Sequence, residues 1–178
     1  MMFKTILVAV DGSDSATKAF RIALDLAETY GASLSLLYVA TAERITAEER
    51  RLAETEHLVD MADVERGLKP QGPMDGTYPL ATFLNRSHEV GLAVRVALGQ
   101  RILESLRKEA EGRGVAVAHV DVAEGDAAQK ILEKAEAVGA DAIAMGSRGF
   151  SDLKGAFLGS TSHKVSSRAP CSVLTLAA

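Results

Sequence analysis

The feature that most constrains this chain is a short apolar run near its start, TILVAV at residues 5–10. Its apolar residues do not alternate with polar ones, so a strand formed here would present apolar side chains on both faces. Strands of this kind occur where helices cover both sides of a parallel sheet. The run SLSLLYVA at 33–40 is expected to form a second strand.

Amphipathic helix patterns separate the expected strands. Apolar residues recur at spacings of three and four from Ala16 to Tyr30, and Gly31 follows where this helix would end. Asp126 is placed to cap a later helix, which Gly139 would close. Further strands are expected at 114–122, 140–146 and 171–177. The alternation predicts an α/β fold with a doubly wound sheet and helices on both faces, in one domain.

Composition excludes several classes of protein. The net charge is −4, and Lys and Arg are scattered among Asp and Glu, so no basic footprint for nucleic acid is expected. No apolar run approaches the roughly 18 residues of a membrane span, and the first residues lack a signal-peptide cleavage site. Cys171 is the single cysteine, so no internal disulfide can form, and its apolar surroundings predict an inert thiol in a buried strand. A reducing, cytoplasmic setting is expected.

The middle of the chain is less regular. Residues 43–66 are highly charged and have a helical pattern, 67–79 hold Pro70, Pro73 and Pro79 and predict a loop, and 80–111 are again helical. Apolar residues between 80 and 98 exceed what one solvated helix would expose. Three roles are open for this segment: an idle insertion, an arm that packs on the core or widens a dimer, and a lid over a ligand.

The stretch AMGSRGFSDLKGAFLGSTSHKV at 144–165 is rich in glycine and hydroxyl residues and lies between an expected strand and an expected helix. Ligands of open α/β sheets bind beyond the carboxyl ends of the strands, where this stretch would meet the turn after residues 5–10. Glycine allows close backbone approach, and Ser160, Thr161 and Ser162 would begin a helix whose free N–H groups favour an anion. Asp11 is placed to accept a hydrogen bond from a nucleoside. The pattern suits phosphate, although many such loops bind nothing.

Other chemistry is weakly supported. The chain has no G-x-x-x-x-G-K-[ST] sequence, and the GRG at 112–114 precedes a strand instead of following one, so neither phosphate motif is present. Ser160, His163 and Asp11 could approach one another, but the nucleophile elbow of a hydrolase is missing. His163 is expected on the surface or in helix packing, and His119 is expected to be structural. No set of residues has metal-ligand spacing.

The sequence resembles the universal stress protein family. The segment GSRGFSDLKGAFLGS matches that family's pattern of Gly, two residues, Gly, nine residues, Gly and Ser, with Gly146, Gly149, Gly159 and Ser160. KTILVAVDGSDSA is similar to its opening strand and turn, and APCSVLTL to its last strand. The similarity covers residues 1–41 and 99–178, whereas 42–98 are longer than the family usually has there.

The resemblance implies a Rossmann-like open sheet of five parallel strands in the order 3-2-1-4-5, forming one universal stress protein domain over 1–178 with an insertion at about 42–98. It implies ATP as ligand, or AMP or cyclic AMP, with Mg²⁺ or Mn²⁺ possible beside the phosphates. Asp11 and Val39 would then meet the adenine or ribose, with Ala9 and Val10 lining the pocket through their backbone. The residues implied around the ribose and phosphates are Met145, Gly146, Arg148, Gly149, Gly159, Ser160, Thr161 and Ser162.

The resulting expectation is an adenine-nucleotide-binding protein of stress response or signalling with little or no turnover, since no positioned base is visible. The alternative is an interaction module of the same fold that binds no nucleotide. A true enzyme of a related superfamily would need a catalytic base that the sequence does not reveal. A homodimer through the last strand, 171–177, is also expected, because an apolar edge strand is otherwise prone to aggregation.

Overall fold

A computed structural model describes residues 3–41, 80–148 and 159–177, with the backbone alone for 80–90. By its internal contacts the chain divides into two units, residues 1–40 with 99–178 and residues 41–98. The first unit holds the whole sheet, and the second holds the insertion expected at about 42–98. Of this second unit, only Thr41 and the helical residues 80–98 are described.

The first unit contains a five-stranded parallel sheet in the order β3-β2-β1-β4-β5, as the resemblance implied. The strands are β1 (Thr5–Val10), β2 (Ser33–Ala40), β3 (Val117–Glu124), β4 (Ala142–Gly146) and β5 (Ser172–Leu176). β1 pairs with β2 on one side and with β4 on the other. Ile6, Leu7 and Val8 are fully buried, which confirms the prediction that this strand is covered on both faces.

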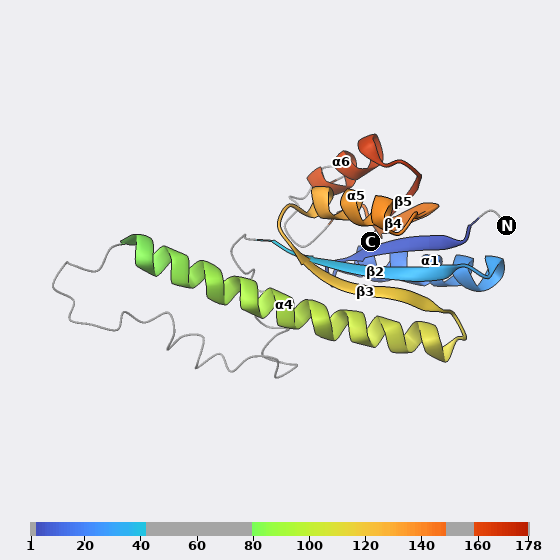
Figure 1. Cartoon of the computed structure of the whole chain (residues 1–178), viewed down its shortest axis with the longest axis horizontal. Helices are drawn as coiled ribbons and strands as arrows, with labels where there is room; N and C mark the ends of the chain where they lie inside the picture. Colours follow the sequence, from blue (N-terminus) through green and yellow to red (C-terminus); the bar gives the residue numbers. More distant parts are fainter. Residues whose placement is uncertain (1–2, 42–79, 149–158, 178) are drawn as a thin grey trace. The chain divides into compact units, whose positions relative to one another are not determined.

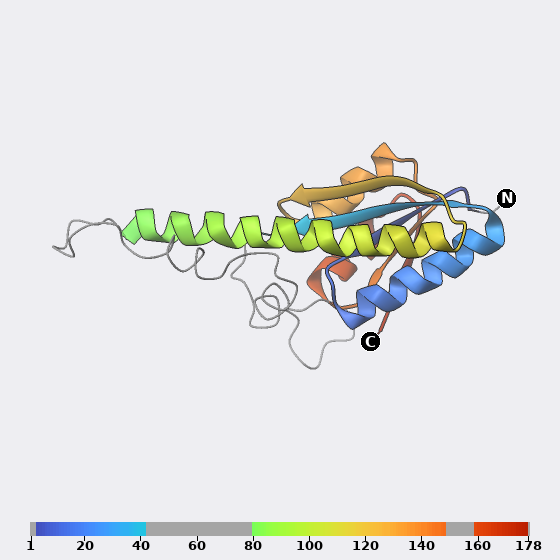
Figure 2. The same ribbon diagram turned by 90° about the horizontal axis from the view of Figure 1, so that it is seen from below.

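Helices cover both faces of the sheet in this unit (Figures 1 and 2). On one face, α5 (Ala127–Ala137) and α6 (Ser160–Arg168) pack over a core that includes Leu7, Leu37 and Ile143. α1 (Asp14–Tyr30) covers the other face, together with the part of α4 (Leu80–Gly112) that belongs to this unit.

Local sequence signals explain the ends of α1 and α5. The Ser13 hydroxyl accepts from the Ala16 N–H at the start of α1, and Gly31 adopts the left-handed conformation, φ 66°, at its end. The Asp126 carboxylate accepts from the Gln129 N–H at 2.9 Å, which confirms the expected cap of α5. α1 therefore ends at the glycine that the sequence indicates, and α5 begins after the expected Asp126. α5 ends at Ala137, with Val138 as its cap and Gly139 next in the left-handed conformation, φ 59°.

The start of β3 differs from the expectation of a strand from residue 114. Gly114 has φ 76°, and the N–H groups of Gly114 and Val115 donate to the carbonyls of Glu111 and Ala110. Gly114 therefore ends α4 instead of beginning a strand, because a left-handed glycine suits a helix terminus. The strand begins at Val117 and continues to Glu124, two residues beyond the expected end.

α4 confirms the prediction that residues 80–111 are helical. It approaches the sheet at Gly99, which has no side chain. A Cβ on Gly99 would lie 2.4 Å from the Tyr38 ring, so this glycine allows the helix to contact β2. In the second unit, the Arg95 guanidinium donates to the Thr41 carbonyl at 2.7 Å. The predicted helix at 43–66 and loop at 67–79 lie outside the described residues, and the role of 42–98 stays a prediction.

One carboxylate connects two strands at the amino-terminal edge of the sheet. Asp141 Oδ2 accepts from the main-chain N–H groups of Lys4 and Thr5 at 2.7 and 2.9 Å. These two bonds lower the pKa of Asp141 below its usual value, against an opposing effect of partial burial. The carboxylate thus ties the entrance of β4 to the entrance of β1.

Cys171 corrects one expectation. It lies just before β5 and is half-buried against the core instead of lying fully inside a buried strand. Burial, and then the nearby Asp141 charge, raise the pKa of its thiol. The raised pKa disfavours the reactive thiolate.

Within the described residues, no helix is both long and apolar enough to cross a membrane.

We predict that Asp141→Asn lowers the free energy of unfolding at pH 7 by about 1 kcal/mol, because two hydrogen bonds lose their charged acceptor. The native pKa of Asp141 is depressed, so its contribution is present above the unfolded-state pKa and is lost as pH falls through the native pKa. The difference between wild type and variant should therefore shrink from about pH 5 towards pH 3. Urea denaturation at several pH values measures this difference.

The matched control is Glu136→Gln, which neutralises an exposed carboxylate on α5. It should leave the free energy of unfolding within about 0.5 kcal/mol of wild type at pH 7. A pH-independent loss in Asp141→Asn would contradict the assigned role of the charge.

Candidate functional site

The carboxyl ends of β1 and β4 bring the first predicted site residues together. The register pairs Ala9 of β1 with Met145 of β4, so the turn after β1 and the chain after β4 emerge side by side. Asp11 follows β1 directly, and Ser147 follows β4. The expected meeting of these two segments at one edge of the sheet is therefore present.

A network of short hydrogen bonds surrounds Asp11. Its Oδ1 accepts from the backbone N–H of Ser13 at 2.9 Å and from the Ser13 hydroxyl at 2.6 Å. The Ser13 and Ser15 hydroxyl oxygens lie 3.1 Å apart. Ser15 in turn donates to the carbonyl of Arg148 at 2.5 Å. These contacts connect the carboxylate after β1 to the chain that leaves β4.

The start of α6 is joined to the same segment from the other side. The Gly159 N–H and the Ser162 hydroxyl both donate to the Ser147 carbonyl at 2.7 Å. Ser162 is 2% exposed, and its oxygen is also 3.0 Å from the Gly159 carbonyl. The Ser162 hydroxyl therefore stabilises the junction between β4 and α6.

The N-termini of α1 and α6 differ in charge and capping. α1 has the Ser13 cap and Asp14 in its first turn. α6 begins after Gly159, which offers no side-chain cap, and its first turn has no acidic residue. The first N–H groups of a helix lack intrahelical partners and carry partial positive charge. α6 is therefore the better place for an anion at this edge of the sheet.

The structure places the remaining predicted residues around these two helix ends. Ala9, Val10 and Met145 are buried, so any contact with a ligand would come from their backbone. Val39 is half-buried against the core. Arg148 and Ser160 are exposed, and Thr161 is half-buried. Gly149 lies outside the described residues, and the ligand-binding role of all these residues stays a prediction.

Sequence reasoning missed three serines at this edge. Ser13 and Ser15 lie in the segment KTILVAVDGSDSA, where the resemblance gave them no separate role, and the bond of Ser15 is to a residue far along the chain. Ser147 is 5% exposed, and its hydroxyl finds no hydrogen-bond partner among the described residues. No spacing pattern marks such a residue in the sequence.

The histidines do not assemble a catalytic set in the part of the chain that the structure describes. His163 is exposed on α6, as expected for a surface position, and His119 is exposed on β3. Among the described residues, no three His, Cys, Asp or Glu side chains are grouped to hold a metal ion.

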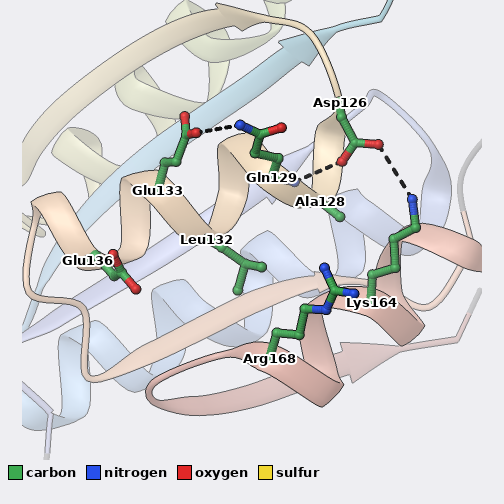
Figure 3. Close-up of a pocket in the computed structure, with 8 residues that line it drawn as sticks. All are labelled: Asp126, Ala128, Gln129, Leu132, Glu133, Glu136, Lys164 and Arg168. Carbon is green, nitrogen blue, oxygen red and sulfur yellow. Dashed lines mark hydrogen bonds and ion pairs between the residues drawn. The ribbon is translucent and has the colours of Figure 1, made fainter.

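A separate hollow of about 440 Å³ lies between α5 and α6 (Figure 3). Asp126, the cap of α5, approaches Lys164 of α6 at 3.5 Å, whereas Glu133 accepts from Gln129 of its own helix (Figure 3). Its lining residues are Asp126, Ala128, Gln129, Leu132, Glu133, Glu136, Lys164 and Arg168. None of them is a predicted site residue, so the hollow is distinct from the edge that holds Asp11.

Solved structures share this fold. Protein MJ0577 has a TM-score of 0.68 at 23% identity, with 100% of this chain and 98% of that chain covered. A universal stress protein family protein from Arabidopsis thaliana, solved with AMP bound, has a TM-score of 0.56 at 18% identity, covering 98% and 91%. A universal stress protein in complex with cAMP has a TM-score of 0.54 at 21% identity, covering 99% and 98%.

The sequence is also similar to curated relatives over nearly its whole length. It is 33% identical to universal stress protein YxiE of Bacillus subtilis over 175 residues, covering 97% of this chain and 98% of YxiE. The model of the universal stress protein family matches residues 2–176. The chain therefore belongs to the universal stress protein family.

Proposed function

We propose that this protein binds an adenine nucleotide at the carboxyl edge of β1 and β4. The observation that carries the proposal is the N-terminus of α6, which has no side-chain cap and is held by Gly159 and Ser162 to the short segment after β4. Ser15 of α1 bonds the same segment, and Ser13 beside it bonds Asp11. An anion site and a carboxylate acceptor are thereby fixed to one piece of backbone. Family members of this fold that were solved with AMP and with cAMP support the proposal.

The two ends of the site have different chemistry. Phosphate oxygens would accept from the free N–H groups at the start of α6 and from the hydroxyls of Ser160 and Thr161. Asp11 would accept from a hydroxyl or amino group of the nucleoside. Ala9, Val10, Val39 and Met145 would line the space between, and Arg148 would lie at the rim.

The finer identity of the ligand is also part of the proposal. ATP is the proposed physiological ligand, with AMP or cyclic AMP as the alternatives, and Mg²⁺ or Mn²⁺ would accompany a triphosphate. We infer a role in stress response or signalling with little or no turnover, since the sequence reveals no positioned catalytic base. We also infer a reducing, cytoplasmic setting from the single cysteine.

We predict binding of AMP or ATP by the nucleotide-free protein with a micromolar dissociation constant, about −8 kcal/mol. Ser160→Asp should weaken this binding at least tenfold, because the new carboxylate repels phosphate at the start of α6. The same charge favours the helix dipole, so the melting temperature should stay the same or rise. Isothermal titration calorimetry and thermal melting measure the two effects.

Three variants act as controls. Ser160→Ala separates loss of the hydroxyl from the added charge and should weaken binding less than Ser160→Asp does. Ser166→Asp adds the same charge to the other end of α6 and should leave affinity within about twofold. Lys164→Gln removes a cation from the hollow between α5 and α6, and a strong loss of affinity there would place the phosphate in that hollow instead. A wild-type protein that binds none of these nucleotides would leave the interaction module as the function.

We further propose that the protein is a homodimer that pairs through β5. β5 lies at the edge of the sheet beside β4, so one side of its backbone has no strand partner within the described sheet. Val173 packs against the core. We therefore expect the dimer contact to be made by backbone hydrogen bonds along the edge of β5 more than by an exposed apolar face. Antiparallel pairing of two copies across a two-fold axis would satisfy both edges.

We predict that light scattering at tens of micromolar gives twice the mass of the chain. Leu176 O accepts from the Ser147 N–H, so alternate residues of β5 face β4 and the N–H of Thr175 faces the free edge. Thr175→Pro removes that edge donor and should shift the population towards monomer. The control is Ser166→Ala, at an exposed residue of α6, which should remain dimeric. Alanine is used there because a proline would disrupt the helix. A monomeric wild type would contradict the proposal.

A further inference from the structure

The hydroxyl of Ser15 connects the start of α1 to the backbone just beyond β4. Ser15 is the second residue of α1 and is 4% exposed. Its Oγ donates to the Arg148 carbonyl oxygen at 2.5 Å, across 133 positions of sequence. A buried side chain of α1 therefore holds the main chain at the point where it leaves the sheet.

Gly146 provides the space that this contact requires. A Cβ at this position would lie 2.4 Å from Ser15 Oγ, 3.0 Å from the Ala16 nitrogen and 3.1 Å from the Arg148 carbonyl oxygen. Gly146 is not among the glycines with positive φ, so its backbone conformation alone would accept another residue. The absence of a side chain at 146 is needed because the Ser15 hydroxyl and the first turn of α1 fill that volume.

The protons of the hydroxyl network fix what each serine can do. Each hydroxyl has one proton. The Ser13 proton is directed to Asp11 Oδ1 at 2.6 Å, and the Ser15 proton is directed to the Arg148 carbonyl. The 3.1 Å contact between the two hydroxyl oxygens therefore receives no proton while both bonds are made. Ser13 serves the carboxylate and Ser15 serves the chain after β4.

The neighbouring carbonyl is held from the opposite side. Ser147 O accepts from Gly159 N–H and from Ser162 Oγ, both at 2.7 Å. Successive carbonyls, of Ser147 and Arg148, are thus bound by the starts of α6 and α1. Loss of the Ser15 hydroxyl would leave this segment bonded to α6 only, whereas loss of the Ser162 hydroxyl would leave the Gly159 N–H bond in place.

We propose that Ser15 is a positioning residue of the nucleotide site. Its hydroxyl occupies the volume left open by Gly146, holds the Arg148 carbonyl towards α1 and so positions the backbone just beyond β4, where the Ser147 carbonyl bonds the start of α6 at the phosphate end of the site. This inference rests on the proposed function. Its consequence is that Ser15 contributes to binding of the phosphate and not to binding of the nucleoside.

The test compares AMP with adenosine, using Ser15→Ala and a matched control. Thr17→Val removes the other first-turn hydroxyl of α1 that bonds to backbone, but that bond, to the Ser13 carbonyl at 3.1 Å, does not reach β4. Calorimetry should show AMP affinity about tenfold weaker in Ser15→Ala, a loss of the size of one hydrogen bond, with adenosine affinity within twofold of wild type. Thr17→Val should bind both ligands within twofold of wild type.

Two results would overturn the inference while leaving nucleotide binding intact. Equal losses of AMP and adenosine affinity in Ser15→Ala would mean that Ser15 only supports the fold. Unchanged affinity for both would mean that the Arg148 contact has no effect on the site. A wild type that binds neither ligand would refute the proposed function, and the exchange measurement below would then decide the role of Ser15.

Amide hydrogen exchange tests the positioning without any ligand. The Ser147 and Gly159 N–H groups donate to Leu176 O and Ser147 O. In Ser15→Ala these two amides should exchange at least tenfold faster than in wild type, while amides of β1 keep their rates. Unchanged exchange at Ser147 and Gly159 would refute the positioning role.

A double-mutant cycle tests the shared volume. Gly146→Ala should lower the melting temperature strongly in wild type, and less in the Ser15→Ala background, because the 2.4 Å conflict with Ser15 Oγ is then removed. The close approaches of the new Cβ to Ala16 N at 3.0 Å and to Arg148 O at 3.1 Å remain, so the melting temperature should recover only in part. Additive shifts in the two backgrounds would show that Ser15 does not occupy the space of a side chain at 146.

Discussion

The fold depends on the burial of β1, in which every residue after Thr5 is buried. Its side chains contact helices on both faces, and both of its edges are hydrogen-bonded, to β2 and to β4. A slip in register is strongly disfavoured for a strand in this position, because residues 6–9 each pair with a strand on both sides. That rigidity extends to its carboxyl end, where Asp11 follows without an intervening loop. The candidate site thus begins on the most constrained backbone of the molecule.

Much of this architecture could be predicted from local sequence. The bounds of β1 and β2, the caps at Gly31 and Asp126, and the start of α6 at Ser160 all follow from short-range patterns. The strand order came from the family resemblance and agrees with the structure. The predicted start of β3 was wrong, because a glycine such as Gly114 can end a helix or precede a strand. Only the hydrogen bonds to Ala110 and Glu111 show that it ends the helix.

The site itself could be predicted only in part, because its decisive contacts join distant positions. The glycine pattern identifies Gly146, but the reason for a glycine there is the Ser15 hydroxyl of α1. Likewise, Ser162 looks like a phosphate ligand in the sequence, whereas its buried hydroxyl bonds the Ser147 carbonyl. A pattern of residue types does not distinguish a side chain that contacts a ligand from one that positions the backbone.

The difference between the two helix starts gives the site a direction. At α1, the Ser13 hydroxyl occupies the Ala16 N–H and Asp14 places a negative charge in the first turn, so an incoming phosphate would meet a satisfied and acidic helix end. At α6, glycine replaces the capping side chain and no carboxylate lies in the first turn. Because both helix starts are bonded to the same segment after β4, the proposed site would hold a nucleotide with its phosphate towards α6 and its donor groups towards Asp11. The reverse orientation would bring like charges together at α1 and leave the N–H groups of α6 without an anion.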